Sequence, residues 1–194
     1  MISPHFYAFL LLFLTILTPN PHIETDLHQI ALLADQREEE NDHFQSFLVT
    51  RTAADIDALV FTLQADISPK IDCRKCGNCC KTLMIEVTQP EADRVAEVLG
   101  VESDQFVAEN LEKGIGQRMI MNAIPCRFLE ELSCTIYADR FAGCREFPAL
   151  HLPGFTARYF TTRMHYARCP IIFNVLEALK KELCFFTPVL PVSV

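Results

Sequence analysis

Apolar residues between residues 24 and 63 recur at intervals of three and four, the spacing of one face of a helix. The first such stripe consists of Leu27, Ile30, Leu32 and Leu33. A polar run at residues 37–42 contains three consecutive glutamates and is typical of a solvated helix face. Thr52 is a suitable cap for a further helix, and Ser68-Pro69-Lys70 interrupts the helical spacing. The pattern predicts a helical arm over residues 23–68.

Beyond residue 82 the apolar runs become shorter and turn residues more frequent. The elements expected there are a strand at 83–87, a helix from Thr88 to Leu99 ending at Gly100, a helix capped by Ser103 that includes Leu111 and ends near Gly114, an extended segment at 118–124, a hairpin between Cys126 and Cys134, a short helical piece at 138–147, a β-rich segment at 155–162 and a closing helix at 171–183. This mixture predicts the α+β class, as a small single domain.

The predicted organisation has four parts. They are an apolar leader at 1–22, the helical arm at 23–68, a cysteine-rich metal-binding domain at 69–184 and a tail at 185–194. Residues 6–17 are almost entirely apolar but too few for a typical transmembrane helix, which needs about 20 residues. They also lack the positive flank and small-residue cleavage site of a signal peptide. Either this stretch exports or anchors the chain, or the true start of translation lies downstream of it.

Composition restricts the class of partner. Half of the 194 residues are apolar, which is enough for a hydrophobic core without help from metal. The net charge of −8, with no basic stripe, argues against binding to nucleic acid. A membrane partner is expected only if the leader is real, and protein partners cannot be assigned from these residues.

The nine cysteines are the unusual feature of the sequence. Eight fall within about a hundred residues and are the candidate metal ligands: Cys73, Cys76, Cys79, Cys80, Cys126, Cys134, Cys144 and Cys169. Thiolates are preferred ligands of zinc and of iron–sulfur clusters, and a two-residue spacing lets one turn bring two sulfurs to one metal. Gly77 suits such a turn. The close spacing disfavours a disulfide scaffold, so we expect reduced thiols and a cytoplasmic protein.

Cys79 and Cys80 are adjacent, and neighbouring side chains diverge along an extended backbone. One of the pair is therefore expected to serve a second metal or to bridge two. Eight thiols satisfy either two four-cysteine zinc sites or one [4Fe–4S] cluster with four ligands to spare. Cys184 stands in an apolar stretch and is expected to be a buried small side chain without a metal role.

Other polar residues near the cysteines have less distinct roles. Arg127, Arg140 and Arg145 either offset thiolate charge around a metal or form surface ion pairs with Glu130, Glu131 or Asp139. His151 and His165 are substitute ligands, although the cysteines already supply enough donors. No nucleotide-binding glycine loop, P-loop or zinc-protease motif occurs.

The segments CRKCGNCC, PCRFLEELSCTIYADRFAGCREFP and RCP together resemble the YkgJ-type CxxCxxCC family of zinc- or iron-chelating domain proteins. The resemblance covers about residues 71–172; a departure is Phe141, where the family pattern has proline, and the apolar leader has no counterpart in that pattern. It implies chelation of zinc or iron, with no established reaction.

Two alternatives to a metal-binding protein remain open. The cysteine pattern also resembles that of flagellin lysine-N-methylases, which would imply a metal-dependent enzyme, although those proteins are much longer. If residues 6–17 are a functional leader, the chain is instead exported and its cysteines form stabilising disulfides.

Overall fold

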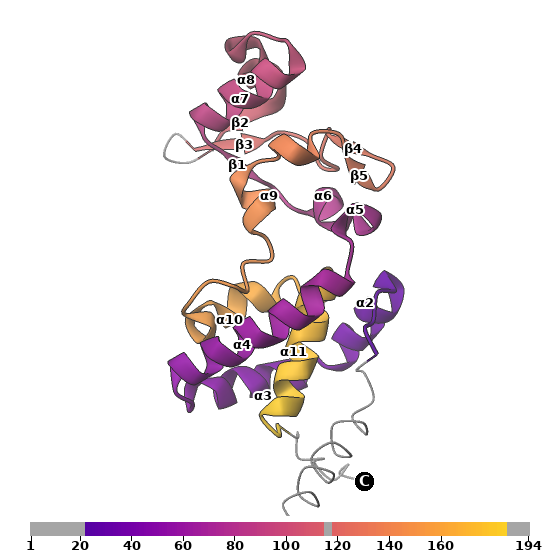
Figure 1. Ribbon diagram of the computed structural model, residues 1–194, viewed down its shortest axis with the longest axis vertical. Helices are drawn as coiled ribbons and strands as arrows, with labels where there is room; N and C mark the ends of the chain where they lie inside the picture. The colour runs from indigo at the N-terminus through magenta and orange to yellow at the C-terminus, as the bar shows by residue number, and fades with distance from the viewer. Residues whose placement is uncertain (1–21, 115–117, 186–194) are drawn as a thin grey trace, which may run out of the picture.

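The computed structural model describes residues 22–114 and 118–185. This part of the chain is mainly helical with two small antiparallel sheets, which confirms the predicted α+β class (Figure 1). In chain order the elements are α2 (Leu27–Gln36), α3 (Glu38–Val49), α4 (Ala53–Ile67), the 3₁₀ turn η1 (Ser68–Lys70), α5 (Cys73–Cys76), α6 (Asn78–Thr82), β1 (Glu86–Val87), α7 (Gln89–Leu99), α8 (Ser103–Asn110), β2 (Leu111–Lys113), β3 (Met119–Met121), β4 (Leu129–Glu130), β5 (Ser133–Cys134), the 3₁₀ turn η3 (Tyr137–Asp139), α9 (Ala142–Glu146), α10 (Phe155–Arg163) and α11 (Pro170–Glu182).

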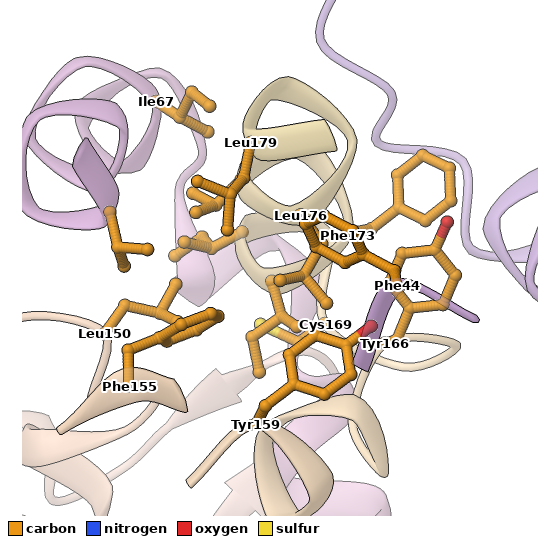
Figure 2. Packing of buried hydrophobic residues seen from close by; sticks show 14 of the residues in the cluster. Phe44, Ile67, Leu150, Phe155, Tyr159, Tyr166, Cys169, Phe173, Leu176 and Leu179 are labelled. Atoms are coloured by element: carbon orange, nitrogen blue, oxygen red, sulfur yellow. The ribbon is translucent and has the colours of Figure 1, made fainter. Parts of the chain in front are cut away.

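The first hydrophobic core lies where α2, α3 and α4 pack against α10 and α11. We call these five helices the helical lobe, which forms one end of the molecule in Figure 1. Figure 2 shows the aromatic centre of this core, in which Phe44 and Tyr159 meet edge to face at 5.7 Å. The predicted helical arm is confirmed, although Leu32 of its first stripe stays 45% exposed. The arm shares its core with α10 and α11.

The second hydrophobic core is smaller and lies at the opposite end of the molecule (Figure 1). It joins α7 and α8 to a three-stranded antiparallel sheet of order β1-β3-β2. The predicted start of α7 is confirmed, since Thr88 and Glu91 form a reciprocal capping box. Gly100 ends the helix in a left-handed conformation, as expected. The segments that carry most of the cysteines, α5, α6, α9 and the β4–β5 hairpin, lie between the two cores.

The β-rich interpretation of residues 155–162 is wrong, because this segment forms α10. Its aromatic and β-branched residues favour strands intrinsically, but Phe155, Tyr159 and Thr162 are buried at helical spacing against the first core. Asp57 also accepts hydrogen bonds from the backbone N–H groups of Gly154 and Phe155, at 2.7 and 2.8 Å, where the helix begins. Tertiary burial therefore overrides the local preference.

Two boundaries also differ from the sequence prediction. The helix after Ser103 ends at Asn110, and Leu111 instead pairs with Met121 in the three-stranded sheet. The strand expected at 83–87 is confined to Glu86–Val87. Within residues 22–114 and 118–185, no helix combines the length and apolar character needed to cross a bilayer. The leader at 6–17 lies outside the described residues.

Candidate metal centre

Cys73, Cys76, Cys79 and Cys80 lie on two single-turn helices joined by Gly77. Because Cys73 and Cys76 are three positions apart on α5, their side chains share one face of that turn. Gly77 has φ of +60°, a conformation that costs other residues about 1–2 kcal/mol. A β-carbon at Gly77 would also stand 2.8 Å from the carbonyl oxygen of Leu132 in the hairpin turn. Glycine is therefore required both to reverse the chain between the cysteine pairs and to admit the hairpin.

Hydrogen bonds connect this cysteine loop to distant parts of the chain that carry other cysteines. The side-chain amide of Asn78 donates to the carbonyl oxygen of Arg168 at 2.8 Å, beside Cys169. The backbone N–H of Cys126 donates to the carbonyl oxygen of Cys80 at 2.7 Å. Neither contact has a local sequence signal, because each joins residues far apart in the chain. Together they bring the first four cysteines, which we call the quartet (Cys73, Cys76, Cys79 and Cys80), close to the later cysteines.

A cavity of about 30 Å³ lies between the cysteine loop and the helical lobe. The cysteines that line this smaller cavity are Cys73, Cys76, Cys79 and Cys169. Ile71 and Ile171 of the first core form part of its apolar wall. Cys169 is only 8% exposed and belongs to the same core, where Figure 2 shows it among the aromatic side chains. The smaller cavity is thus supported by the helical lobe.

A second cavity of about 120 Å³ lies on the other side of the quartet. The cysteines that line this larger cavity are Cys73, Cys79, Cys80, Cys126, Cys134 and Cys144. The last three of them pack against the second core, whose Phe128, Ile136 and Phe141 also line the cavity. Each of the eight predicted cysteines therefore lines at least one cavity, and Cys73 and Cys79 line both.

Cys184 lines neither cavity, and its expected burial is wrong. The residue is exposed just after the end of α11, with φ of +49°. Its apolar neighbours Leu183 and Phe185 do pack against the first core, but the side chain of Cys184 between them is exposed, so the hydrophobicity of the neighbours was a poor guide here. All nine cysteines are free thiols in this structure.

Burial is the largest influence on the pKa of most thiols that line the two cavities. It raises the pKa of Cys126 and Cys134, and it raises the pKa of Cys144 and of Cys169 to about 12 in each case. The positive charge of Arg140 partly offsets this effect on the pKa values of Cys134 and Cys144. At neutral pH these thiols are protonated, so a metal that binds them must displace protons.

Cys79 and Cys80 form the exception, because their Sγ atoms lie 4.0 Å apart within a weak hydrogen bond. This hydrogen bond lowers the pKa of Cys79 and raises the pKa of Cys80. The helical turn of α6 keeps the adjacent sulfurs closer than an extended backbone would. Cys79 lines both cavities, whereas Cys80 lines only the larger one.

Of the three arginines considered, Arg140 and Arg145 line the larger cavity and Arg127 does not. Arg140 lies over the ring of Tyr137 at 4.0 Å from its centroid and donates to the Tyr137 carbonyl oxygen at 2.7 Å. Asp139 pairs with Arg94, at 3.5 Å, rather than with any of the predicted arginines. Arg140 and Arg145 are thus placed to offset negative charge at the thiols.

The two candidate histidines differ in their position relative to the cavities. His151 is exposed and lines neither cavity, whereas His165 lines the smaller one. As the side chains stand, no three His, Cys, Asp or Glu groups of the described residues are close enough to hold a metal together. Binding therefore requires the thiols to change rotamer toward a shared position. The donor set itself fits zinc or iron, because soft thiolate ligands select these metals.

Neither the curated proteins nor the solved structures include a match to this chain. A family model does match: residues 72–170 fit the model named CxxCxxCC and described as "Putative zinc- or iron-chelating domain". The matched segment contains every cysteine that lines the two cavities. It also agrees with the resemblance carried by the sequence motifs. The chain belongs to the CxxCxxCC family of zinc- or iron-chelating domains.

Proposed function

We propose that this protein binds zinc or iron through eight cysteines at two adjoining positions. The observation that carries the proposal is the division of the thiols. Cys76 and Cys169 line only the smaller cavity, and four others line only the larger one: Cys80, Cys126, Cys134 and Cys144. Cys73 and Cys79 stand between them and line both. Four thiolates are a complete ligand set for one zinc ion or one [4Fe–4S] cluster.

The cavity volumes differ enough to separate the kinds of centre that fit. A cavity needs a volume of roughly 10–15 Å³ to hold one water molecule, so the smaller cavity, at about 30 Å³, suits a single ion. The larger cavity, at about 120 Å³, has room for a group of several atoms such as an iron–sulfur cluster. Chelation requires reduced thiols, so we place the functional protein in a reducing compartment, the cytoplasm.

The test is to purify the full chain without oxygen and to measure zinc, iron, inorganic sulfide and visible absorption on one sample. We expect more than one metal atom per chain. Sulfide with brown colour would identify a cluster, and colourless zinc protein would identify two single-ion sites. Protein that stays metal-free after reconstitution with Zn²⁺ and, separately, with iron and sulfide would contradict the proposal.

Single variants then test the division between the cavities. Cys169→Ser should remove metal from the smaller cavity alone, and Cys144→Ser from the larger cavity alone. Cys184→Ser is the matched control, because this thiol is exposed outside both cavities. Metal loss in the control equal to that in the other two would refute the assigned ligands.

A further inference from the structure

His165 combines two features that belong together at a metal site. It lines the smaller cavity beside the thiols of Cys73, Cys76 and Cys169. Its Nδ1 atom is also buried and has no hydrogen-bond partner. A buried polar atom without a partner is costly, and an ion is one of the few groups that remove such a cost. Four other side chains among the described residues carry an atom of this kind, and none of them lines either cavity: Asn41, Arg94, Asn110 and Thr156.

The local backbone holds His165 close to Cys169. The backbone N–H of Cys169 donates to the carbonyl oxygen of His165 at 2.9 Å, so one tight turn links the two residues. The imidazole ring packs edge-on against Phe147, with ring centroids 5.3 Å apart at an angle of 83°. Phe147 itself lines both cavities and limits where the imidazole can move.

We propose that His165 is a metal ligand in the smaller cavity and completes a three-cysteine, one-histidine zinc site with Cys73, Cys76 and Cys169. This assignment rests on the proposed function, because it supposes that the smaller cavity binds an ion. Three thiolates and one imidazole are a standard tetrahedral zinc set. Cys79, whose sulfur lies 4.0 Å from that of Cys80, is then free to serve the larger cavity.

The alternative set for the same ion is Cys73, Cys76, Cys79 and Cys169, with His165 as a bystander. The two sets make opposite predictions for two variants. If His165 is a ligand, His165→Gln weakens zinc binding at the smaller cavity and Cys79→Ser leaves it nearly unchanged. If Cys79 is the fourth ligand, the two effects are exchanged.

The experiment titrates the full-length, reduced protein with Zn²⁺ alone while NMR follows the nitrogen resonances of the imidazole rings. We expect one imidazole nitrogen, assigned to His165, to shift on zinc binding. Because the loss of a group that merely supports a ligand costs about 10–100-fold in metal affinity, we expect His165→Gln to weaken the site by about 100-fold or more. His151→Gln is the matched control, since His151 is exposed and lines neither cavity.

The NMR readout uses the unaltered protein and so decides the question even where a variant folds poorly. Zinc binding with an unshifted His165 nitrogen would overturn the assignment while leaving the proposed function intact. Loss of the smaller-cavity zinc in Cys79→Ser but not in His165→Gln would do the same. If no Zn²⁺ binds to the reduced protein, the zinc site and its His165 ligand both fail, and the iron–sulfur arm of the earlier test decides the remainder of the proposed function.

Discussion

The two cavities share a cysteine loop but differ in the core that supports them. The smaller cavity is walled by Ile71 and Ile171 of the first core and includes the buried Cys169. The larger cavity is walled by Phe128 and Phe141 of the second core. A metal in each position would therefore connect the quartet to a different half of the molecule. This difference makes the quartet the joint between two separately packed regions.

The elements around the joint also differ in length from those of the helical lobe. In the helical lobe, α4 has 15 residues and α11 has 13, and both bury an apolar face. Around the thiols, α5 has four residues, and α6 and α9 have five each. Helices this short are unstable alone, whereas packing of a longer amphipathic face supplies most helical stability. The helical lobe can therefore stay ordered without metal, while the cysteine segments depend on long-range contacts and, in our proposal, on the bound ions.

Removal of the metal is expected to produce the largest difference between the cysteine segments and the helical lobe. Apparent binding free energies for structural zinc are about 10–16 kcal/mol, so a chelator should strongly loosen the segments that carry the ligands. Amide hydrogen exchange measured before and after chelation should show protection lost in α5, α6 and the β4–β5 hairpin. Protection in α4 and α11 should persist. Uniform loss across both regions would mean that the helical lobe also depends on metal.

A core truncation in the helical lobe should have the next largest effect and should not depend on metal. Leu176 is 0% exposed, so Leu176→Ala should lower the free energy of unfolding by about 2–5 kcal/mol. Leu32→Ala, at a position 45% exposed, is the control and should change it by less than about 0.5 kcal/mol. Denaturant unfolding with and without metal measures both. A loss seen only in the metal-loaded protein would contradict the independence of the two regions.

The joint itself is tested by a pair of glycine substitutions. Gly77→Ala incurs the left-handed backbone cost of about 1–2 kcal/mol and also forces the new methyl group against Leu132. Gly100→Ala incurs the same backbone cost at φ of +69°, but no atom lies within 4 Å of the added β-carbon. We expect Gly77→Ala to weaken metal binding and Gly100→Ala to leave it unchanged. Equal effects in a metal titration would show that the contact with the hairpin is unimportant.

Alkaline pH should produce a separate effect, and only in metal-free protein. Cys144 and Cys169 have folded-state pKa values raised from 9.0 to about 12, so above pH 9 the folded chain retains protons that the unfolded chain releases. The free energy of unfolding therefore falls as pH rises from about 9 to about 12. Urea unfolding at pH 8 and pH 10 should show this fall, and Cys144→Ala with Cys169→Ala should reduce it. Cys184→Ala, at an exposed site, should retain the full slope.

Local sequence signals were sufficient for many of the elements. The capping pair Thr88 and Glu91 and the terminal Gly100 mark the ends of α7, because caps act within one turn of the helix. The cysteine spacing was likewise sufficient to identify the candidate ligands and the family, since chelating turns are built from nearby residues. The same local reasoning failed for α10, whose residues favour a strand until they are packed against α3 and α4.

The sequence by itself determined the mixed α+β class, the helical arm and the set of eight thiols. Only the tertiary structure decided which thiols line which cavity, that Cys184 stays outside both, and that His165 stands beside Cys169 and the quartet. The physical reason is that these groupings depend on contacts between distant segments, such as Asn78 with Arg168 and Gly77 with Leu132. Such contacts form only when the two cores pack, and no local pattern of residues encodes them.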